Sequence, residues 1–200
     1  MWKPVDTEFF VPLLPVSLVH VSGGGMELTR AALEALGCVV LAHRVGTPSD
    51  FLRVLGQGDQ TPRYMVILGH GDENGLAFGE YGPKEIDVSI LRDGSLPPEA
   101  MGAHVDLPGC TVISYSCGGG TDAMARAFLA GGAAAYIGCR TEVQTVALTL
   151  FLFHFLFGAL HKKLSDADAW RQAVLAVDHP EVDQMRFWHG NSREEPFARH

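Results

Sequence analysis

The sequence predicts an α/β domain with a mostly parallel sheet of about five to six strands and helices on both faces. Short apolar runs alternate with segments of helical spacing, which is the pattern of parallel strands joined by helical crossovers. The 200 residues, 47% of them hydrophobic, suffice for one compact core and are few for two. We therefore expect a single domain over residues 1–200.

The first third of the chain contains three apolar runs that predict strands and two segments that predict helices. The strands are expected at 16–21, from 38 to 41, and at 64–68. A helix at 27–36 is expected to end at Gly37, and a second helix, capped by Ser49 or Asp50, at Leu55. A helix after each strand fits right-handed crossovers between parallel strands.

The remainder of the chain continues this alternation after a glycine-rich stretch that predicts a hairpin. Expected are the hairpin at 76–82, strands at 110–114 and 133–138, and helices at 123–130, 143–163 and 167–177. Thr121 or Asp122 and Ser165 or Asp166 are suited to cap two of these helices. The proline-rich residues 82–109 are expected to form a surface excursion, and the last 20 residues are left unassigned.

Two of the predicted strands lead into side chains that can form a nucleophile and its base. The run 64–68 leads to His70 and Gly71, and the run 111–114 leads to Cys117. Ligands of open α/β sheets bind at the carboxyl ends of the strands, so we expect His70 and Cys117 to meet at one sheet edge. A thiolate beside an imidazole performs acyl transfer.

The sequence around Cys117 suits a reactive thiolate. The N-terminus of the helix predicted at 123–130 would lower the thiol pKa, because its unpaired N–H groups carry partial positive charge. The glycines at 118–120 let a substrate backbone approach and offer N–H donors to an oxyanion, as does Gly71. Ser116 and Gly118 flank Cys117 and are expected to bind substrate.

The loop after the strand at 133–138 is expected to border the same pocket, since consecutive strand ends share one sheet edge. Glu142 facing inward would favour Lys or Arg in the substrate, whereas Arg140 facing inward would favour Asp or Glu. The basic preference is the one we favour. Asp72 is a further candidate for contact with the substrate or for tuning His70.

The charge of the chain limits the class of partner. A formal net charge of -8, a pI near 5.5 and scattered basic residues disfavour binding to nucleic acid or to an anionic membrane.

Residues 143–160 carry no Asp, Glu, Lys or Arg and have the length of a membrane span. Because Gln144 and His154 interrupt that run, a buried core helix is the favoured interpretation.

The N-terminus and the cysteines indicate the compartment. The first residues mix Lys3 and Asp6, and prolines break the apolar stretch that follows, unlike a signal peptide. The four cysteines show neither CxxC spacing nor the density of a disulfide scaffold. We therefore expect reduced thiols and a cytoplasmic protein.

Around these residues the chain resembles the caspase-like cysteine peptidases of clan CD. In that group an apolar strand ends in His-Gly, and a later strand ends in the nucleophilic Cys. The strand end Tyr115-Ser116-Cys117-Gly118-Gly119 and the following helix and Gly-Ala turn at 125–133 are most similar to CHAT and gingipain domains. The resemblance covers about residues 14–177 and implies a three-layer caspase-like fold.

The resemblance also implies a function. It implies a cysteine endopeptidase that acts through a thioester acyl-enzyme, with His70 and Cys117 as the dyad and the Gly71 and Cys117 N–H groups as the oxyanion hole. It implies a peptide or protein substrate and neither a metal nor another cofactor. The residues after the first strand, 22–27, include no basic side chain, so the aspartate specificity of caspases is not expected. The small size of the chain suggests regulation by a protein partner.

Two other interpretations stay open at this point. An α/β-hydrolase or amidotransferase-like enzyme could use Cys117 as nucleophile, with His154, His179 or His189 as base. Alternatively, the chain could be a catalytically silent scaffold that keeps the caspase-like fold and binds a partner. Substitution of the histidines separates the two enzymes, and an active-site-directed thiol label separates an enzyme from a scaffold.

Overall fold

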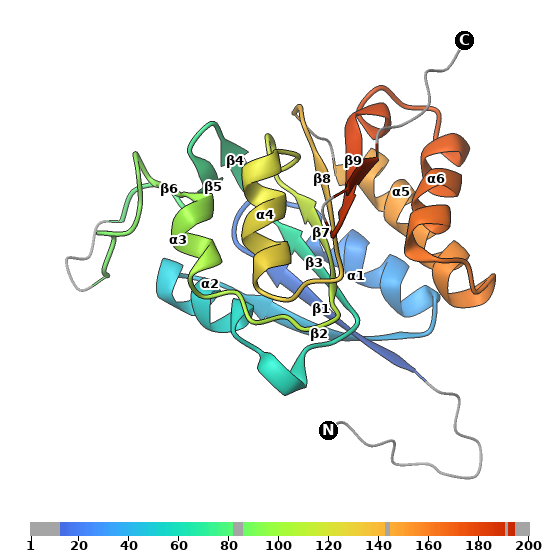
Figure 1. Cartoon of the computed structure of the whole chain (residues 1–200), viewed down its shortest axis with the longest axis horizontal. Coiled ribbons are helices and arrows are strands. Elements are labelled where there is room, and N and C mark those ends of the chain that lie inside the picture. The colour runs from blue at the N-terminus through green and yellow to red at the C-terminus, as the bar shows by residue number, and fades with distance from the viewer. Residues whose placement is uncertain (1–12, 82–85, 143–144, 191, 195–200) are drawn as a thin grey trace.

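A computed structural model of the chain describes residues 13–81, 86–142, 145–190 and 192–194. Seven of its strands form the main sheet: β1 (Leu14–His20), β2 (Cys38–Arg44), β3 (Tyr64–Leu68), β7 (Thr111–Tyr115), β8 (Ala135–Cys139), β9 (Met185–His189) and β10 (Ser192–Glu194). Their spatial order is β10-β9-β8-β7-β3-β1-β2 (Figure 1). The five strands from β8 to β2 are mutually parallel, and β9 and β10 add an antiparallel edge.

The predicted mixed α/β architecture with a mostly parallel sheet is confirmed, but the sheet is larger than expected. The five predicted strands are present, and the extra two come from the C-terminal stretch that the sequence left unassigned. In β9 the residues Met185 to Trp188 are buried, including Arg186, which is 8% exposed. A buried arginine and a terminal histidine break the apolar pattern by which the other strands were found.

Helices cover both faces of the sheet (Figure 1). The helices α1 (Met26–Ala35), α5 (Thr145–Leu156) and α6 (Asp166–Ala176) share one core, and α2 (Pro48–Leu55), α3 (Pro98–Gly102) and α4 (Asp122–Ala130) share the other. Alternate residues of β3 enter the two cores, because successive side chains of a strand point to opposite faces. Thus Val66 packs on the first layer, and Met65 and Ile67 pack on the second.

A second, three-stranded sheet lies beyond the carboxyl edge of the main one. It is built from β4 (His70–Asp72), β5 (Gly75–Ala77) and β6 (Ser95–Leu96), all antiparallel. The hairpin therefore spans 70–77 and begins at His70, which corrects the range 76–82 expected from the glycines. The short loop between β4 and β5 is stabilised by the Asp72 carboxylate, which accepts hydrogen bonds from the backbone N–H groups of Asn74 (2.8 Å) and Gly75 (3.1 Å).

The stretch 82–109 is more than the surface excursion that its prolines suggested. Residues 82–85 lie outside the described residues, but the rest supplies β6 and α3 and buries Leu96, Met101 and Leu107 completely. Its apolar side chains are spaced irregularly along the sequence, so neither helical nor strand periodicity marked them as core.

The helix caps agree in part with the sequence. Thr121 and Ser165 cap α4 and α6 as expected, each accepting a backbone N–H bond in the first turn. At α2 the cap is Thr47, whose hydroxyl accepts from the Asp50 N–H at 3.2 Å, and Pro48 is the first helical residue. The expected caps Ser49 and Asp50 therefore lie inside the helix, because proline fits the first turn.

The apolar run at 143–160 forms α5 followed by a π-helical turn, η2 (Phe157–His161). Residues 143–144, where the helix was expected to begin, lie outside the described residues. Leu148, Phe151, Leu152 and Phe155 are completely buried against the sheet, as expected for a core helix. Among the described helices none has both the length and the apolar character needed to cross a membrane.

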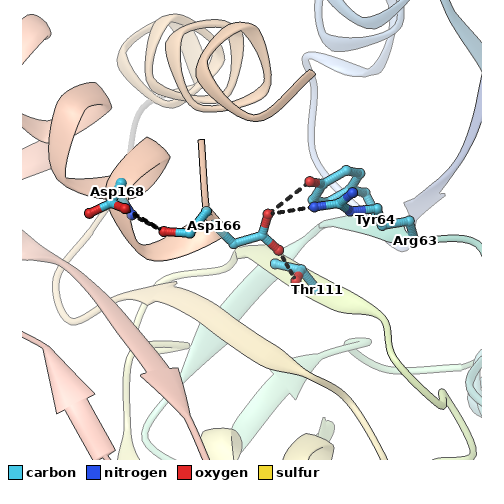
Figure 2. Close-up of polar contacts among 6 residues, drawn as sticks. Arg63, Tyr64, Thr111, Asp166 and Asp168 are labelled. Carbon is cyan, nitrogen blue, oxygen red and sulfur yellow. Dashed lines mark hydrogen bonds and ion pairs between the residues drawn. The ribbon is translucent and has the colours of Figure 1, made fainter. Parts of the chain in front are cut away.

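A partly buried carboxylate, Asp166, joins α6 to the amino ends of two central strands (Figure 2). Asp166 accepts hydrogen bonds from Tyr64 Oη at 2.9 Å and Thr111 Oγ1 at 2.6 Å, and it forms an ion pair with Arg63 at 3.2 Å. Tyr64 begins β3 and Thr111 begins β7, so this contact fixes the sheet edge opposite the one that carries His70 and Cys117. Burial, followed by the Asp166 charge, raises the pKa of Tyr64.

Candidate active site

His70 and Cys117 follow two adjacent parallel strands at equal distance from their ends. Leu68, the last residue of β3, pairs in register with Tyr115, the last residue of β7. His70 lies two residues beyond Leu68, and Cys117 lies two residues beyond Tyr115. Adjacent strands in this register carry both side chains to the same edge of the sheet.

Both side chains line one small cleft at that edge. The cavity has a volume of about 60 Å³ and is lined by Ser22, Gly23, Gly24, Leu68, Gly69, His70, Tyr115, Cys117 and Leu148. His70 is exposed and Cys117 is partly exposed, so both are open to a molecule in solution. The cleft is formed from the loop after β1, the two strand ends and α5.

The segments that carry His70 and Cys117 are in backbone contact. A Cβ built on Gly71 would come within 2.3 Å of the carbonyl oxygen of Cys117 and within 3.1 Å of Ser116 Cβ. One residue further on, Gly118 has a φ of +66°, and a Cβ there would be 3.4 Å from the carbonyl oxygen of Asp72. Any side chain at Gly71 would force the two segments apart.

The loop after β1 holds the histidine in place. The backbone N–H of His70 donates to Ser22 Oγ at 3.0 Å. Gly23, with a φ of +83°, lies under the imidazole, where a Cβ would be 3.2 Å from His70 Nε2. The sequence indicated this loop only by its three glycines after a strand, and its role in positioning His70 was missed.

The turn at Cys117 is anchored to β8 and to residues below it. Gly120 N–H donates to the carbonyl of Cys139 at 2.7 Å, and Tyr136 Oη donates to the carbonyl of Gly119 at 2.8 Å. Ser116 is 1% exposed, and its hydroxyl is 2.8 Å from that of Ser114. Ser116, expected to bind substrate, therefore supports the turn from beneath.

The glycines at 118–120 separate Cys117 from the N-terminus of α4. The lowering of the Cys117 thiol pKa by that helix therefore stays a prediction.

Cys117 differs from the other three cysteines in its exposure. Burial raises the pKa of Cys38 to about 11 and that of Cys110 to about 12, and it also raises the pKa of Cys139. These three thiols stay protonated and covered at neutral pH, which makes them poor nucleophiles. All four cysteines are free, so the partly exposed Cys117 is the thiol accessible to an electrophile.

Asp72, Arg140 and Glu142, also predicted to bind substrate, lie outside the lining of this cleft. Both oxygens of Asp72 are engaged in the hairpin, since Oδ2 also accepts from Ser95 Oγ at 2.6 Å. Arg140 and Glu142 are exposed on the loop after β8, with the backbone of Arg140 against Gly120. None of these three is among the described residues that line the cleft.

The histidines of the alternative hydrolase interpretation lie elsewhere. His154 and His179 line a groove between α5 and α6, and His189 contacts Glu194 at 3.3 Å. Among the described residues that line the cleft with Cys117, His70 is the one histidine. The histidine that shares the cleft with Cys117 therefore precedes it in the chain.

Comparisons with solved structures bear on the fold. Gingipain R, described as an Arg-specific cysteine proteinase, superposes with a TM-score of 0.54 at 10% identity. The match covers 85% of this chain and 44% of gingipain R. Separase in the Saccharomyces cerevisiae separase-securin complex superposes with TM-scores of 0.56 and 0.54 in two crystal structures, at 10% and 13% identity. Each separase match covers 90% of this chain.

The fold is caspase-like. At these identities the likeness establishes the arrangement of strands and helices and leaves activity to be argued from the site. The chain spans less than half of gingipain R and 12% to 13% of separase, so it corresponds to one part of each. No protein-family model matches the sequence, and no curated protein does either.

Proposed function

We propose that the protein is a cysteine endopeptidase that uses Cys117 as nucleophile and His70 as proton carrier. The observation that carries the proposal is that one cleft on a caspase-like fold is lined by an exposed imidazole and a partly exposed thiol. An exposed cleft of this composition favours an enzyme over a silent scaffold.

The proposed reaction proceeds in two steps. Cys117 Sγ attacks the carbonyl carbon of the scissile peptide bond, and the resulting oxyanion is stabilised by the backbone N–H groups of Gly71 and Cys117. His70 takes the thiol proton and delivers it to the leaving amine, which leaves a thioester on Cys117. Water, deprotonated by His70, then hydrolyses the thioester and regenerates the thiol.

We further propose a preference for Lys or Arg before the scissile bond. Glu142, exposed on the loop after β8, is the carboxylate offered to such a side chain. The neighbour gingipain R is described as Arg-specific, which supports the same choice. Since the lining of the cleft contains no carboxylate, the proposed preference depends on Glu142 from the loop after β8, and Glu142→Gln should weaken it.

Regulation by a protein partner is also proposed. Separase is crystallised in complex with securin, which supports a protein partner for a chain of this fold.

The four free cysteines suit a reducing compartment, and a cytoplasmic location is proposed on that ground. Fractionation of cells that produce the tagged protein tests the location.

The direct test is a panel of fluorogenic peptides that differ only in the residue before the cleaved bond. Wild type is expected to cleave the Arg and Lys members, Cys117→Ala to cleave none, and Glu142→Gln to lose the basic preference while keeping cleavage of neutral members. Cleavage that persists in Cys117→Ala would contradict the proposal. Equal rates for basic and acidic members would contradict the specificity alone.

A further inference from the structure

A second cysteine, Cys139, ends the strand next to the one that leads to Cys117. The strands β7 and β8 pair in parallel with Ser114 opposite Gly138. The next residue of each strand, Tyr115 in β7 and Cys139 in β8, is also its last. Because Cys117 follows Tyr115 by two residues, the two cysteines lie at the same edge of the sheet, on adjacent strands.

The turn that carries Cys117 packs directly on the end of β8. Gly120 N–H donates to the carbonyl oxygen of Cys139 at 2.7 Å. A Cβ built on Gly138 would come within 2.8 Å of the carbonyl oxygen of Gly119. The turn therefore leaves β7 beside β8 and returns to β8 at the residue that holds the second thiol.

The two cysteine side chains lie on the same face of the sheet. Cys139 belongs to the core that α1, α5 and α6 share, together with Tyr115 and Leu148. Tyr115 and Leu148 also line the cleft that contains Cys117. The pKa of the Cys139 thiol is raised by burial and, to a smaller extent, by nearby negative charge, that of Cys117 included. This electrostatic effect agrees with the packing in making the two sulfurs neighbours.

We propose that Cys139 is a resolving thiol that forms a disulfide with Cys117 after a hydroperoxide has oxidised Cys117. In the first step Cys117 Sγ attacks a peroxide oxygen, and Cys117 becomes a sulfenic acid as hydrogen peroxide is reduced to water. In the second step Cys139 Sγ attacks the Cys117 sulfur and displaces hydroxide, which takes the Cys139 proton and leaves as a second water. Two thiols lose two electrons, and the peroxide gains them.

The difference in exposure between the two thiols sets the order of the steps. Cys117 is partly exposed and meets the oxidant first, whereas Cys139 is 0% exposed and its thiol donates to the Glu181 carbonyl at 3.4 Å. Closure of a disulfide requires Cα atoms within about 7 Å. The glycines at 118–120 let the turn move towards β8, since Gly118 already has a φ of +66° that favours glycine.

The disulfide would protect Cys117 from irreversible oxidation and block it as a nucleophile until a thiol reduces the bond. The consequence for peptide hydrolysis rests on the proposed function. Formation of the disulfide does not, because it requires only the two thiols and a peroxide.

Peptide mapping without reduction tests the proposal on the folded full chain. Reduced protein is treated with hydrogen peroxide, alkylated with iodoacetamide in denaturant and digested. Wild type should give one linked pair of peptides, joining Cys117 to Cys139, and dithiothreitol should release it. In Cys139→Ala, Cys117 should instead proceed to the sulfinic acid. Cys110→Ala is the matched control, because Cys110 is also 0% exposed but lies in the core on the other face of the sheet, and it should form the link like wild type.

The wild-type map decides the proposal even where a variant fails to fold. Sulfinic acid on Cys117 with Cys139 still a free thiol would overturn it, as would a disulfide that joins the Cys117 residues of two molecules. Peptide hydrolysis measured on the same samples should be lost with peroxide and regained with dithiothreitol in wild type, and lost permanently in Cys139→Ala. A wild type that links the two cysteines but hydrolyses no peptide would refute the proposed function and leave the disulfide standing.

Discussion

Gly71 lies against Cys117 so closely that a Cβ on Gly71 would come within 2.3 Å of the Cys117 carbonyl oxygen. The hairpin that starts at His70 and the turn that holds Cys117 are thereby locked together through their backbones. The spacing of the two reactive groups depends on this contact, and four experiments follow from the surrounding structure.

Gly71→Ala should separate the two halves of the site. The methyl group would push the hairpin away from Cys117, and a shift of about 1 Å at a catalytic group costs roughly 100-fold in rate. The same overpacking should lower the free energy of unfolding by about 1–3 kcal/mol. Peptide hydrolysis and urea denaturation measure the two effects. Gly46→Ala, where a Cβ has no atom within 4 Å, is the control and should change neither.

Alkylation should distinguish Cys117 from the other cysteines. Iodoacetamide at neutral pH is expected to modify Cys117 first, because burial covers Cys38, Cys110 and Cys139 and raises the pKa of each. Mass mapping of the folded protein at increasing times measures the order. Prior modification of any buried cysteine would contradict the described packing. All four should react together in denaturant.

Removing the Asp166 carboxylate should destabilise the protein without altering the site. Asp166→Ala leaves the buried Tyr64 and Thr111 hydroxyls without their acceptor, so the free energy of unfolding should fall by about 2–3 kcal/mol. Asp168→Ala, on the exposed side of the same helix, should lower the free energy of unfolding by clearly less than Asp166→Ala does. Hydrolysis rates of the folded variants should stay near wild type. Equal destabilisation by both substitutions would contradict the role given to Asp166.

Asp122 should contribute stability that depends on pH. Its pKa is lowered by the hydrogen bond from Trp188 Nε1 and, less, by Arg193. Because the folded pKa lies below the ordinary 3.8, the stabilisation is present above that pH and is lost as the pH falls through the folded pKa. Urea denaturation of wild type and Asp122→Asn should therefore differ at pH 7 and converge in acid. A constant difference would remove Asp122 as the cause.

The sequence predicted the strand ends better than the contacts between them. β3 was found because Tyr64–Leu68 is a continuous apolar run, and β7 because the mostly apolar residues 110–114 lead towards Cys117. The closeness of Gly71 to Cys117 and the placement of Ser22 against His70 arise from tertiary packing, which leaves no periodicity in the chain. β9 was missed because Arg186 interrupts its apolar pattern, and Thr47 was missed as a cap because Ser49 and Asp50 follow it.

The central claim is that His70 and Cys117 act together in one cleft, and covalent labelling with a peptidyl acyloxymethyl ketone ending in Arg tests it most directly. Intact-mass and peptide mapping should find one adduct, on Cys117, in wild type. The adduct should be absent in Cys117→Ala and form at least about 100-fold more slowly in His70→Ala, with His179→Ala as the control that labels like wild type. Labelling at another residue, or labelling of Cys117 at an unchanged rate in His70→Ala, would contradict the claim.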